Sequence, residues 1–118
     1  MRANVPRPAD FCVPLWDGRC LWIEAKKTQQ MSLSFDSFRD HQPPALLDLV
    51  ARQQVTWVLV NFRNSEKKRN KAFAISPVPL FAYSDTADRK SWPLVFFEEN
   101  ALELTRAKSQ WDLSHLIL

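Results

Sequence analysis

The sequence predicts an α/β domain in which helices flank a mixed central β-sheet. Three features lead to this prediction: a hairpin signal near the start, a helix pattern behind two prolines, and an apolar strand pattern directly after that helix. The chain has 118 residues, which suits one domain with a core of its own. Hydrophobic residues make up 46% and charged residues 25%, so the composition is that of a globular protein rather than a disordered one.

The first expected element is a β-hairpin centred on the one glycine of the chain. Gly18 follows Asp17, and an Asp-Gly pair between two β-prone runs is typical of a hairpin turn. The two arms are expected over residues 10–16 and 19–26. In the second arm, apolar and polar residues alternate, which predicts a strand with one face on a core. The apolar set is Leu21, Ile23 and Ala25, and the other set is Cys20, Trp22, Glu24 and Lys26.

The elements after the hairpin follow from the prolines and the apolar runs. Residues 28–42 are expected to form a polar connection with a helical turn near Asp36, and Pro43 and Pro44 then suit the first turn of a helix that continues to Gln54. The remaining pattern predicts a central strand over 55–62, a basic loop over 63–71, a strand over 72–76, a turn over 77–83 leading into a short helix, and a short helix over 111–118 packed on the sheet.

The pattern that can carry chemistry is one acidic residue at the start of the hairpin and a Glu-x-Lys sequence in its second arm. Glu24 and Lys26 are two positions apart on a strand, so their side chains project from the same face. Two carboxylates that converge make a site for a hard divalent cation such as Mg²⁺, and a nearby lysine can orient a water or stabilise charge. Asp10, Glu24 and Lys26 are therefore the candidate catalytic residues.

Whether Asp10 lies on the face of Glu24 depends on the hairpin register. A two-residue Asp-Gly turn pairs Asp10 with Ala25 and points its side chain to the opposite face. A three-residue connection pairs Asp10 with Lys26 and brings it to the face of Glu24. Pro14 cannot donate to a strand ladder, so a bulge at this position would also correct the register. Periodicity alone leaves both geometries open.

The residues around this pattern resemble the core of RecU-type Holliday junction resolvases, which belong to the PD-(D/E)xK nuclease superfamily. The similarity lies in Pro8-Ala9-Asp10-Phe11, in Ile23-Glu24-Ala25-Lys26-Lys27-Thr28, and in Phe38-Arg39-Asp40-His41-Gln42 followed by a leucine-bearing helix. It continues more weakly over residues 112–117. The resemblance implies a restriction-endonuclease-like nuclease core, and it favours the register that brings Asp10 to Glu24.

The resemblance also implies roles for individual residues. Asp10 and Glu24 would bind Mg²⁺ or Mn²⁺ with help from the carbonyl of Ala25, and Lys26 would serve the attacking water. Thr28 and Gln42 fall close to the active site, where Thr28 would contact DNA and Gln42 would support catalysis. The implied activity is a metal-dependent, structure-selective DNA endonuclease that resolves a four-way junction by paired nicks and leaves ligatable 5′-phosphate ends. The implied partners are the four-way junction and a second copy of the chain in a homodimer, without an organic cofactor.

The resemblance includes a further element that this sequence does not show. In the family, a helix carrying another acidic residue precedes the first motif, whereas here nine residues precede Asp10 and none of them is acidic. We therefore expect a single nuclease domain over residues 1–118 without that N-terminal helix. Two other functions stay open: a PD-(D/E)xK nuclease acting on another DNA substrate, and a catalytically weak junction-binding module.

The most basic stretch of the chain is a candidate DNA contact. Clustered Lys and Arg supply the sequence-independent part of DNA affinity, although a merely solvated loop is the other interpretation of such a run. The candidate phosphate-binding residues are Arg63, Lys67, Lys68, Arg69 and Lys71.

Composition and charge exclude several other classes of protein. The formal net charge of +3 permits an anionic partner without requiring one. Cys12 and Cys20 are too few for a disulfide framework and lack the spacing of a zinc site. The sequence has no signal-peptide pattern and no apolar stretch long enough to cross a bilayer. We therefore expect a cytoplasmic protein, in a bacterial cell or a phage-infected host, without membrane contact.

Overall fold

The computed structural model describes residues 8–107 and 110–116. This part of the chain forms an α/β fold with a five-stranded mixed sheet and three α-helices, as the sequence predicted. The main elements are β1 (Phe11–Pro14), β2 (Cys20–Thr28), α1 (Gln42–Ala51), β4 (Val55–Asn64), β5 (Arg69–Ile75), α2 (Pro77–Thr86), α3 (Leu94–Asn100) and β7 (Leu102–Glu103). The small elements are β3 (Ser32–Ser34), η1 (Phe35–Ser37), β6 (Ser91–Pro93), β8 (Arg106–Ala107), β9 (Gln110–Trp111) and η2 (Ser114–Leu116).

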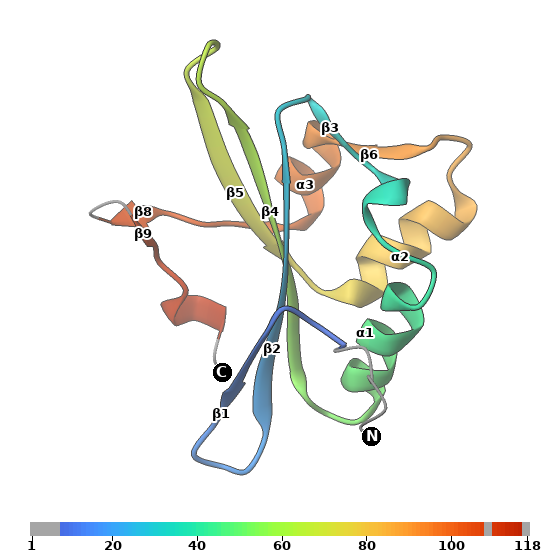
Figure 1. Cartoon of the computed structure of the whole chain (residues 1–118), viewed down its shortest axis with the longest axis vertical. Helices are drawn as coiled ribbons and strands as arrows, with labels where there is room; N and C mark the ends of the chain where they lie inside the picture. Colours follow the sequence, from blue (N-terminus) through green and yellow to red (C-terminus); the bar gives the residue numbers. More distant parts are fainter. Residues whose placement is uncertain (1–7, 108–109, 117–118) are drawn as a thin grey trace, which may run out of the picture.

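The strands of the large sheet run in the order β1-β2-β4-β5-β7. β2 and β4 are parallel, and the other neighbouring pairs are antiparallel. Because parallel neighbours need a crossover connection, the chain passes through β3, η1 and α1 between β2 and β4. Figure 1 shows the sheet nearly edge-on, with the three helices on one side and β8, β9 and η2 on the other. We call these the helix face and the C-terminal face of the sheet.

The larger core lies on the helix face. Its side chains come from the central strands β4 and β5 and from all three helices, and they include Val58, Val60, Phe62, Phe73, Ile75, Leu46, Leu80 and Phe97. The aromatic rings meet edge to face, with the Phe62 and Phe97 centroids 5.3 Å apart. Trp92 of β6 is buried here as well, and its indole N–H donates to the carbonyl of Leu80 at 2.9 Å. Burial of such large side chains is worth about 1.5–3 kcal/mol each.

A smaller core lies on the C-terminal face. Its buried residues are Ala72, Ala74, Leu104 and Leu116. Trp57 packs against them half-buried, and its indole N–H donates to the carbonyl of Leu116 at 2.9 Å. The helix expected over 111–118 is instead a short strand followed by a 3₁₀ turn, and residues 117–118 lie outside the described part of the chain.

The first hairpin has neither of the two expected registers. Pro14 pairs with Cys20, so the connection spans five residues, from Leu15 to Arg19. Gly18 adopts a φ of 90°, and the Asp17 carboxylate accepts a hydrogen bond from the Arg19 backbone N–H at 3.1 Å. These local bonds stabilise a wider loop than an Asp-Gly turn alone would need.

The two faces of β2 are assigned differently from the expectation. Glu24 and Lys26 lie on the helix face, in register with Val58 and Val60 of β4, whereas Leu21 and Ile23 are buried on the C-terminal face and Ala25 is exposed. Alternation fixes which residues share a face, but it does not say which face the helices cover. Ion pairing allows the two charged residues to lie against the larger core.

The expected loop over 63–71 is largely strand. β4 extends to Asn64 and β5 begins at Arg69, so only residues 65–68 form the turn of a long hairpin. The sequence did not predict this part of the hairpin, because a run of charged and polar side chains shows no alternation of apolar and polar residues. The helices also start earlier than expected: α1 begins at Gln42, and α2 begins directly at Pro77, where Ser76 caps it by accepting from the N–H of Val78. None of the helices in the described ranges is long and apolar enough to span a membrane.

Candidate active site

Asp10 and Glu24 lie side by side and are joined by backbone hydrogen bonds. The N–H of Asp10 donates to Glu24 Oε1 at 3.1 Å, and the N–H of Ala25 donates to Asp10 Oδ2 at 2.9 Å. The hairpin register causes this arrangement, because Phe11 lies opposite Ile23 in an antiparallel pair, so Asp10, just before Phe11, comes next to Glu24, just after Ile23. Asp10 therefore reaches the face of Glu24, although by a different register from the one that was favoured. Asp10 is exposed and Glu24 is only 2% exposed, so one carboxylate faces solvent and the other is shielded.

Lys26 completes the cluster on the same strand face. Its Nζ lies 3.1 Å from Glu24 Oε2 and donates to the carbonyl of Ser37 at 2.7 Å. The ammonium also lies 4.7 Å from the centre of the Phe38 ring, within the range of a cation–π contact. With the side-chain oxygen of Gln42 at 3.4 Å as the fourth, these partners hold a mostly buried ammonium at one position beside the carboxylates.

Gln42, the first residue of α1, connects the helix to both charged groups. Its Nε2 donates to Glu24 Oε2 at 3.0 Å, and its Oε1 accepts from Lys26 Nζ at 3.4 Å. The same oxygen accepts from the backbone N–H of Arg39 at 2.8 Å, which fixes the amide orientation. Gln42 is therefore a positioning residue for Glu24 and Lys26.

Two contributors to this cluster were not among the sequence candidates. Ser37 takes part through its backbone carbonyl, which leaves no trace in the sequence. Phe38 belongs to the segment that carries the family resemblance, and that resemblance is the sequence signal that could have found it.

The residues present fit a divalent metal ion. Within the described ranges, no group of three or more His, Cys, Asp or Glu side chains is arranged to hold a metal. Mg²⁺, however, is commonly bound by one or two carboxylates and takes its other ligands from water and substrate phosphates. Asp10 and Glu24 supply two such carboxylates, and the exposure of Asp10 leaves the pair open to solvent on one side. The carbonyl of Ala25 follows Glu24 on the same strand.

Three of the candidate DNA-binding residues make intramolecular bonds through their side chains. Thr28 Oγ1 donates to the carbonyl of Ser32 at 3.0 Å and so closes the β2–β3 turn. The Arg69 guanidinium donates to the carbonyl of Gln29 at 2.9 Å and contacts the sulfur of Met31, and Lys71 pairs with Glu98 of α3. These contacts give the three residues a structural role in addition to any contact with DNA.

The other candidates project from the β4–β5 hairpin. Arg63, Lys67 and Lys68 are all exposed, and no carboxylate of the described residues lies within ion-pair distance of them. Figure 1 shows that this hairpin extends beyond the rest of the sheet. Its turn therefore presents positive charge away from the body of the domain.

Comparison with known proteins gives one family. The model of the family described as Recombination protein U, RecU, matches residues 9–116, which includes every residue of the cluster described above. None of the curated proteins matches the chain.

Proposed function

Because this chain belongs to the RecU family of recombination proteins, we propose that it is a metal-dependent endonuclease that resolves four-way DNA junctions by paired nicks. The observation that carries the proposal is the bonding of Asp10 to Glu24 and Ala25 beside the Lys26 ammonium. Two carboxylates can hold a divalent metal ion that activates water for phosphodiester hydrolysis, and a fixed cation can stabilise the charge that develops on the phosphate. A cytoplasmic location, in a bacterial cell or a phage-infected host, goes with this activity.

Each residue of the cluster has a distinct role in this proposal. Asp10, Glu24 and the carbonyl of Ala25 would hold Mg²⁺ or Mn²⁺, which when bound polarises the phosphate and lowers the pKa of a water ligand. Lys26 orients the attacking water and offsets negative charge on the phosphate, since Ser37 and Glu24 fix its ammonium. Gln42 holds the Glu24 carboxylate and the Lys26 ammonium in place relative to each other.

DNA binding would involve the β4–β5 hairpin. Arg63, Lys67 and Lys68 are exposed and have no carboxylate partner among the described residues, so they are available to phosphates. Arg69 and Lys71 would add charge while they hold the hairpin to the β2–β3 turn and to α3. Thr28 keeps the turn closed next to the DNA.

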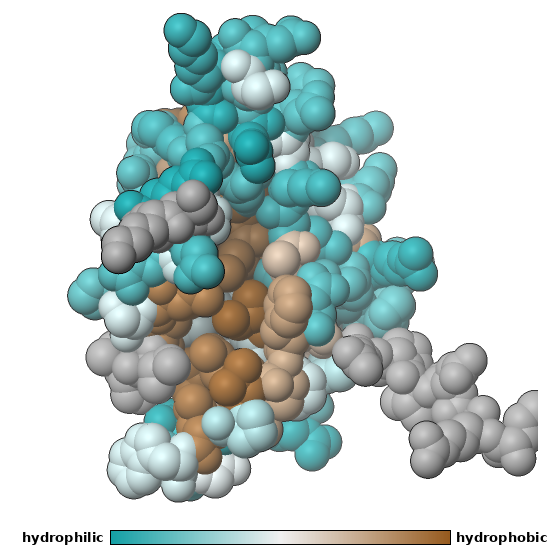
Figure 2. All heavy atoms as spheres, turned by 60° about the vertical axis from the view of Figure 1, so that its left-hand side comes forward, coloured by the Kyte–Doolittle hydropathy of each residue, from teal (hydrophilic) through white to brown (hydrophobic). Residues whose placement is uncertain are grey.

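Paired nicks require two active sites, which supports a homodimer. A candidate contact is the apolar part of the C-terminal face next to β1, where Phe11 is 58% and Val13 47% exposed. Figure 2 shows apolar side chains gathered in the middle of this side of the molecule. Exposed apolar patches of this kind are typical of protein contacts.

The dimer is tested by light scattering of Val13→Lys against Val95→Lys. Val95 lies on α3 and is similarly exposed, at 52%. We expect Val13→Lys to dissociate the dimer and Val95→Lys to leave it intact. A monomer for the unmodified protein, or equal behaviour of the two variants, would contradict this part of the proposal.

The nuclease activity is tested on three labelled substrates: a four-way junction, a linear duplex and a flap, each with Mg²⁺ and with EDTA. Asp10→Asn is the sharpest variant, because Asp10 is exposed and an Asn oxygen can still accept from the Ala25 N–H, so folding is preserved. Glu24→Gln tests the buried carboxylate. Asp88→Asn, on the exposed connection between α2 and β6, is the matched control.

We expect symmetric nicks in the junction alone, abolished by EDTA, by Asp10→Asn and by Glu24→Gln, and unchanged by Asp88→Asn. Cleavage of the duplex or flap at an equal rate would instead assign the site to another DNA substrate. Binding of the junction without any cleavage would leave a binding module. Neither binding nor cleavage would refute the nuclease and the module together.

A further inference from the structure

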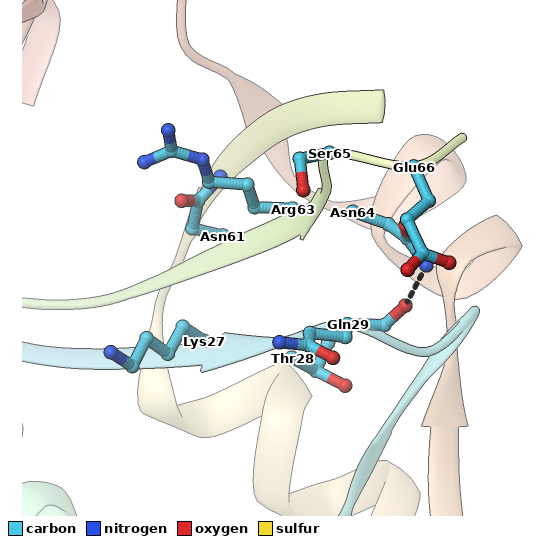
Figure 3. Close-up of a pocket in the computed structure, with 8 residues that line it drawn as sticks. All are labelled: Lys27, Thr28, Gln29, Asn61, Arg63, Asn64, Ser65 and Glu66. Atoms are coloured by element: carbon cyan, nitrogen blue, oxygen red, sulfur yellow. Dashed lines mark hydrogen bonds between the residues drawn. The ribbon is translucent and has the colours of Figure 1, made fainter. Parts of the chain in front are cut away.

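A polar pocket opens on the C-terminal face where β2 and β4 end, with a volume of about 620 Å³. Figure 3 shows the eight residues that line it: Lys27, Thr28, Gln29, Asn61, Arg63, Asn64, Ser65 and Glu66. None of them is apolar, two carry a positive charge and one carries a negative charge. A lining of this kind suits an anion with several hydrogen-bond acceptors rather than an apolar ligand.

The two cations of the pocket lie on the same face of the sheet. Lys27 is in register with Asn61 of β4, and Arg63 follows Asn61 by two positions, so all three point away from the face of Lys26. Both cations are exposed, and no carboxylate of the described residues pairs with either of them. In Figure 3, Glu66 lies at the opposite end of the pocket from both cations. The cationic end is therefore free to bind an anion.

The walls of the pocket are held in place by side-chain bonds. The carbonyl of Gln29 accepts from Asn64 Nδ2 at 3.2 Å and from the Arg69 guanidinium at 2.9 Å, which ties the β2–β3 turn to the hairpin. Asn61 Nδ2 donates to Asn70 Oδ1 at 2.9 Å and to the carbonyl of Lys71 at 3.0 Å. Because these wall groups are already held, the ordering cost of binding an anion is confined mainly to the Lys27 and Arg63 side chains.

The pocket and the active site lie on the two sides of one open strand edge. Among the described residues, β1 pairs with β2 only as far as Ile23, so the outer edge of β2 beyond that point carries no neighbouring strand. Glu24 and Lys26 face one side of this edge and Lys27 faces the other. Lys27 lies three residues beyond Glu24, a separation of about 10 Å along the strand. One DNA backbone that crosses the edge can reach both places.

We propose that this pocket binds a non-scissile backbone phosphate of the DNA through Lys27 and Arg63, while the scissile phosphate lies at Asp10 and Glu24 on the other side of β2. This assignment rests on the proposed function, since it takes DNA as the ligand. It adds Lys27 to the DNA-binding residues and separates Arg63 from the cations at the hairpin turn.

The test measures junction binding in EDTA over a range of salt concentrations, so that cleavage plays no part. Lys27→Ala/Arg63→Ala should flatten the slope of log Kd against log salt by about 0.9 for each phosphate that the protein no longer neutralises. Glu66→Gln should tighten binding, because it removes the one negative charge of the pocket. The control is Arg89→Ala/Lys90→Ala, which removes the same two charges from exposed positions before β6.

A control effect as large as that of Lys27→Ala/Arg63→Ala would show general charge attraction and overturn the assignment. An unchanged slope for Lys27→Ala/Arg63→Ala would do the same. Titration of ¹⁵N-labelled protein with inorganic phosphate at constant ionic strength separates a second source of the ligand. Saturable shifts at Lys27 and Arg63 together with an unchanged slope would assign the pocket to free phosphate. If the unmodified protein binds no DNA at all, the proposed function fails first, which this series distinguishes.

Discussion

Single residues decide how the charged cluster is stabilised. Glu24 is buried against the helix face, and its carboxylate is matched by the Lys26 ammonium at 3.1 Å and by the Gln42 amide at 3.0 Å. Removing one member of a buried ion pair leaves an uncompensated charge, which typically costs more than the pair itself contributes. Among the groups around the buried pair, Gln42 is the neutral one, so changing it leaves no buried charge without its partner.

Gln42→Ala tests whether Gln42 positions the two charged groups. It removes both amide contacts but keeps the Glu24–Lys26 pair, so we expect metal affinity or cleavage rate to fall about 10–100-fold, as for other residues that orient metal ligands. Single-turnover cleavage and Mg²⁺ titration measure the effect. Gln30→Ala, at an exposed position in the β2–β3 turn, is the control and should leave both unchanged. A rate for Gln42→Ala equal to that of the control would contradict the positioning role.

A second prediction at this scale concerns Cys12. Desolvation, a hydrogen bond with Cys20 and the charge of Cys20 raise the pKa of the Cys12 thiol. A raised pKa means less thiolate at any pH below it, so Cys12 should react with iodoacetamide more slowly than a free thiol at neutral pH.

Peptide mass spectrometry over a pH series measures this rate for Cys12 alone. In the Cys20→Ala variant, the midpoint of the profile should move to lower pH, because two of the three causes disappear. An unchanged midpoint would show that Cys20 has no influence on Cys12.

At the scale of elements, the sequence predicted the strands and helices better than the connections and the register between them. The hairpin, the central strand β4 and the helix behind Pro43 were predicted from local patterns that depend on few residues. The register of β1 and β2 was not, because the five-residue connection depends on hydrogen bonds of Asp17 and Leu15 that no periodicity encodes. The ends of β4 and β5 next to their turn were predicted as loop because Arg, Asn and Lys occupy them.

The end of α1 carries a testable strain. Gln53 adopts a φ of 65°, a left-handed conformation that glycine takes without a steric penalty. Its N–H and that of Gln54 satisfy the last carbonyls of the helix at 3.0 Å. Gln53→Gly should therefore raise the free energy of unfolding by about 0.5–1 kcal/mol.

Urea denaturation followed by circular dichroism checks this change. Ala51→Gly, two residues earlier and still within the helix, should have the opposite sign and lower the stability by up to about 1 kcal/mol. A loss of stability in both variants would mean that the side chain of Gln53 contributes more than its backbone costs.

At the scale of the whole molecule, the two faces of the sheet are covered by hydrophobic cores of different size. Apolar residues from three helices fill one face, whereas the other is covered by a segment whose strands have two residues each. The alternating pattern of β2 predicted which residues share a face. The pattern could not predict which of the two faces the helices cover. In the sequence, Glu24 and Lys26 are typical of a solvated face, and only the folded chain places Gln42, Ser37 and Phe38 against them.

Leu116→Ala tests whether the C-terminal segment belongs to the same cooperative unit. Leu116 is 1% exposed, and truncation of such a leucine costs about 2–5 kcal/mol where the site cannot collapse. We expect one unfolding transition at lower urea concentration for this variant. Val78 is half-exposed on α2, and Val78→Ala should lower the free energy of unfolding by less than about 0.5 kcal/mol. A separate early transition in the Leu116 variant would show that the segment unfolds independently.

The tie between the β2–β3 turn and the β4–β5 hairpin has a consequence for where a junction is cut. Asn64 and Arg69 both bond to Gln29, a few residues after Lys26 on the same stretch of chain. The hairpin turn and the carboxylates therefore keep one separation, whatever sequence the DNA has. We expect the nicks to fall at a constant number of nucleotides from the branch point when arm sequences are changed, which mapping on sequencing gels measures. In the Arg69→Ala variant the cut positions should spread over neighbouring nucleotides.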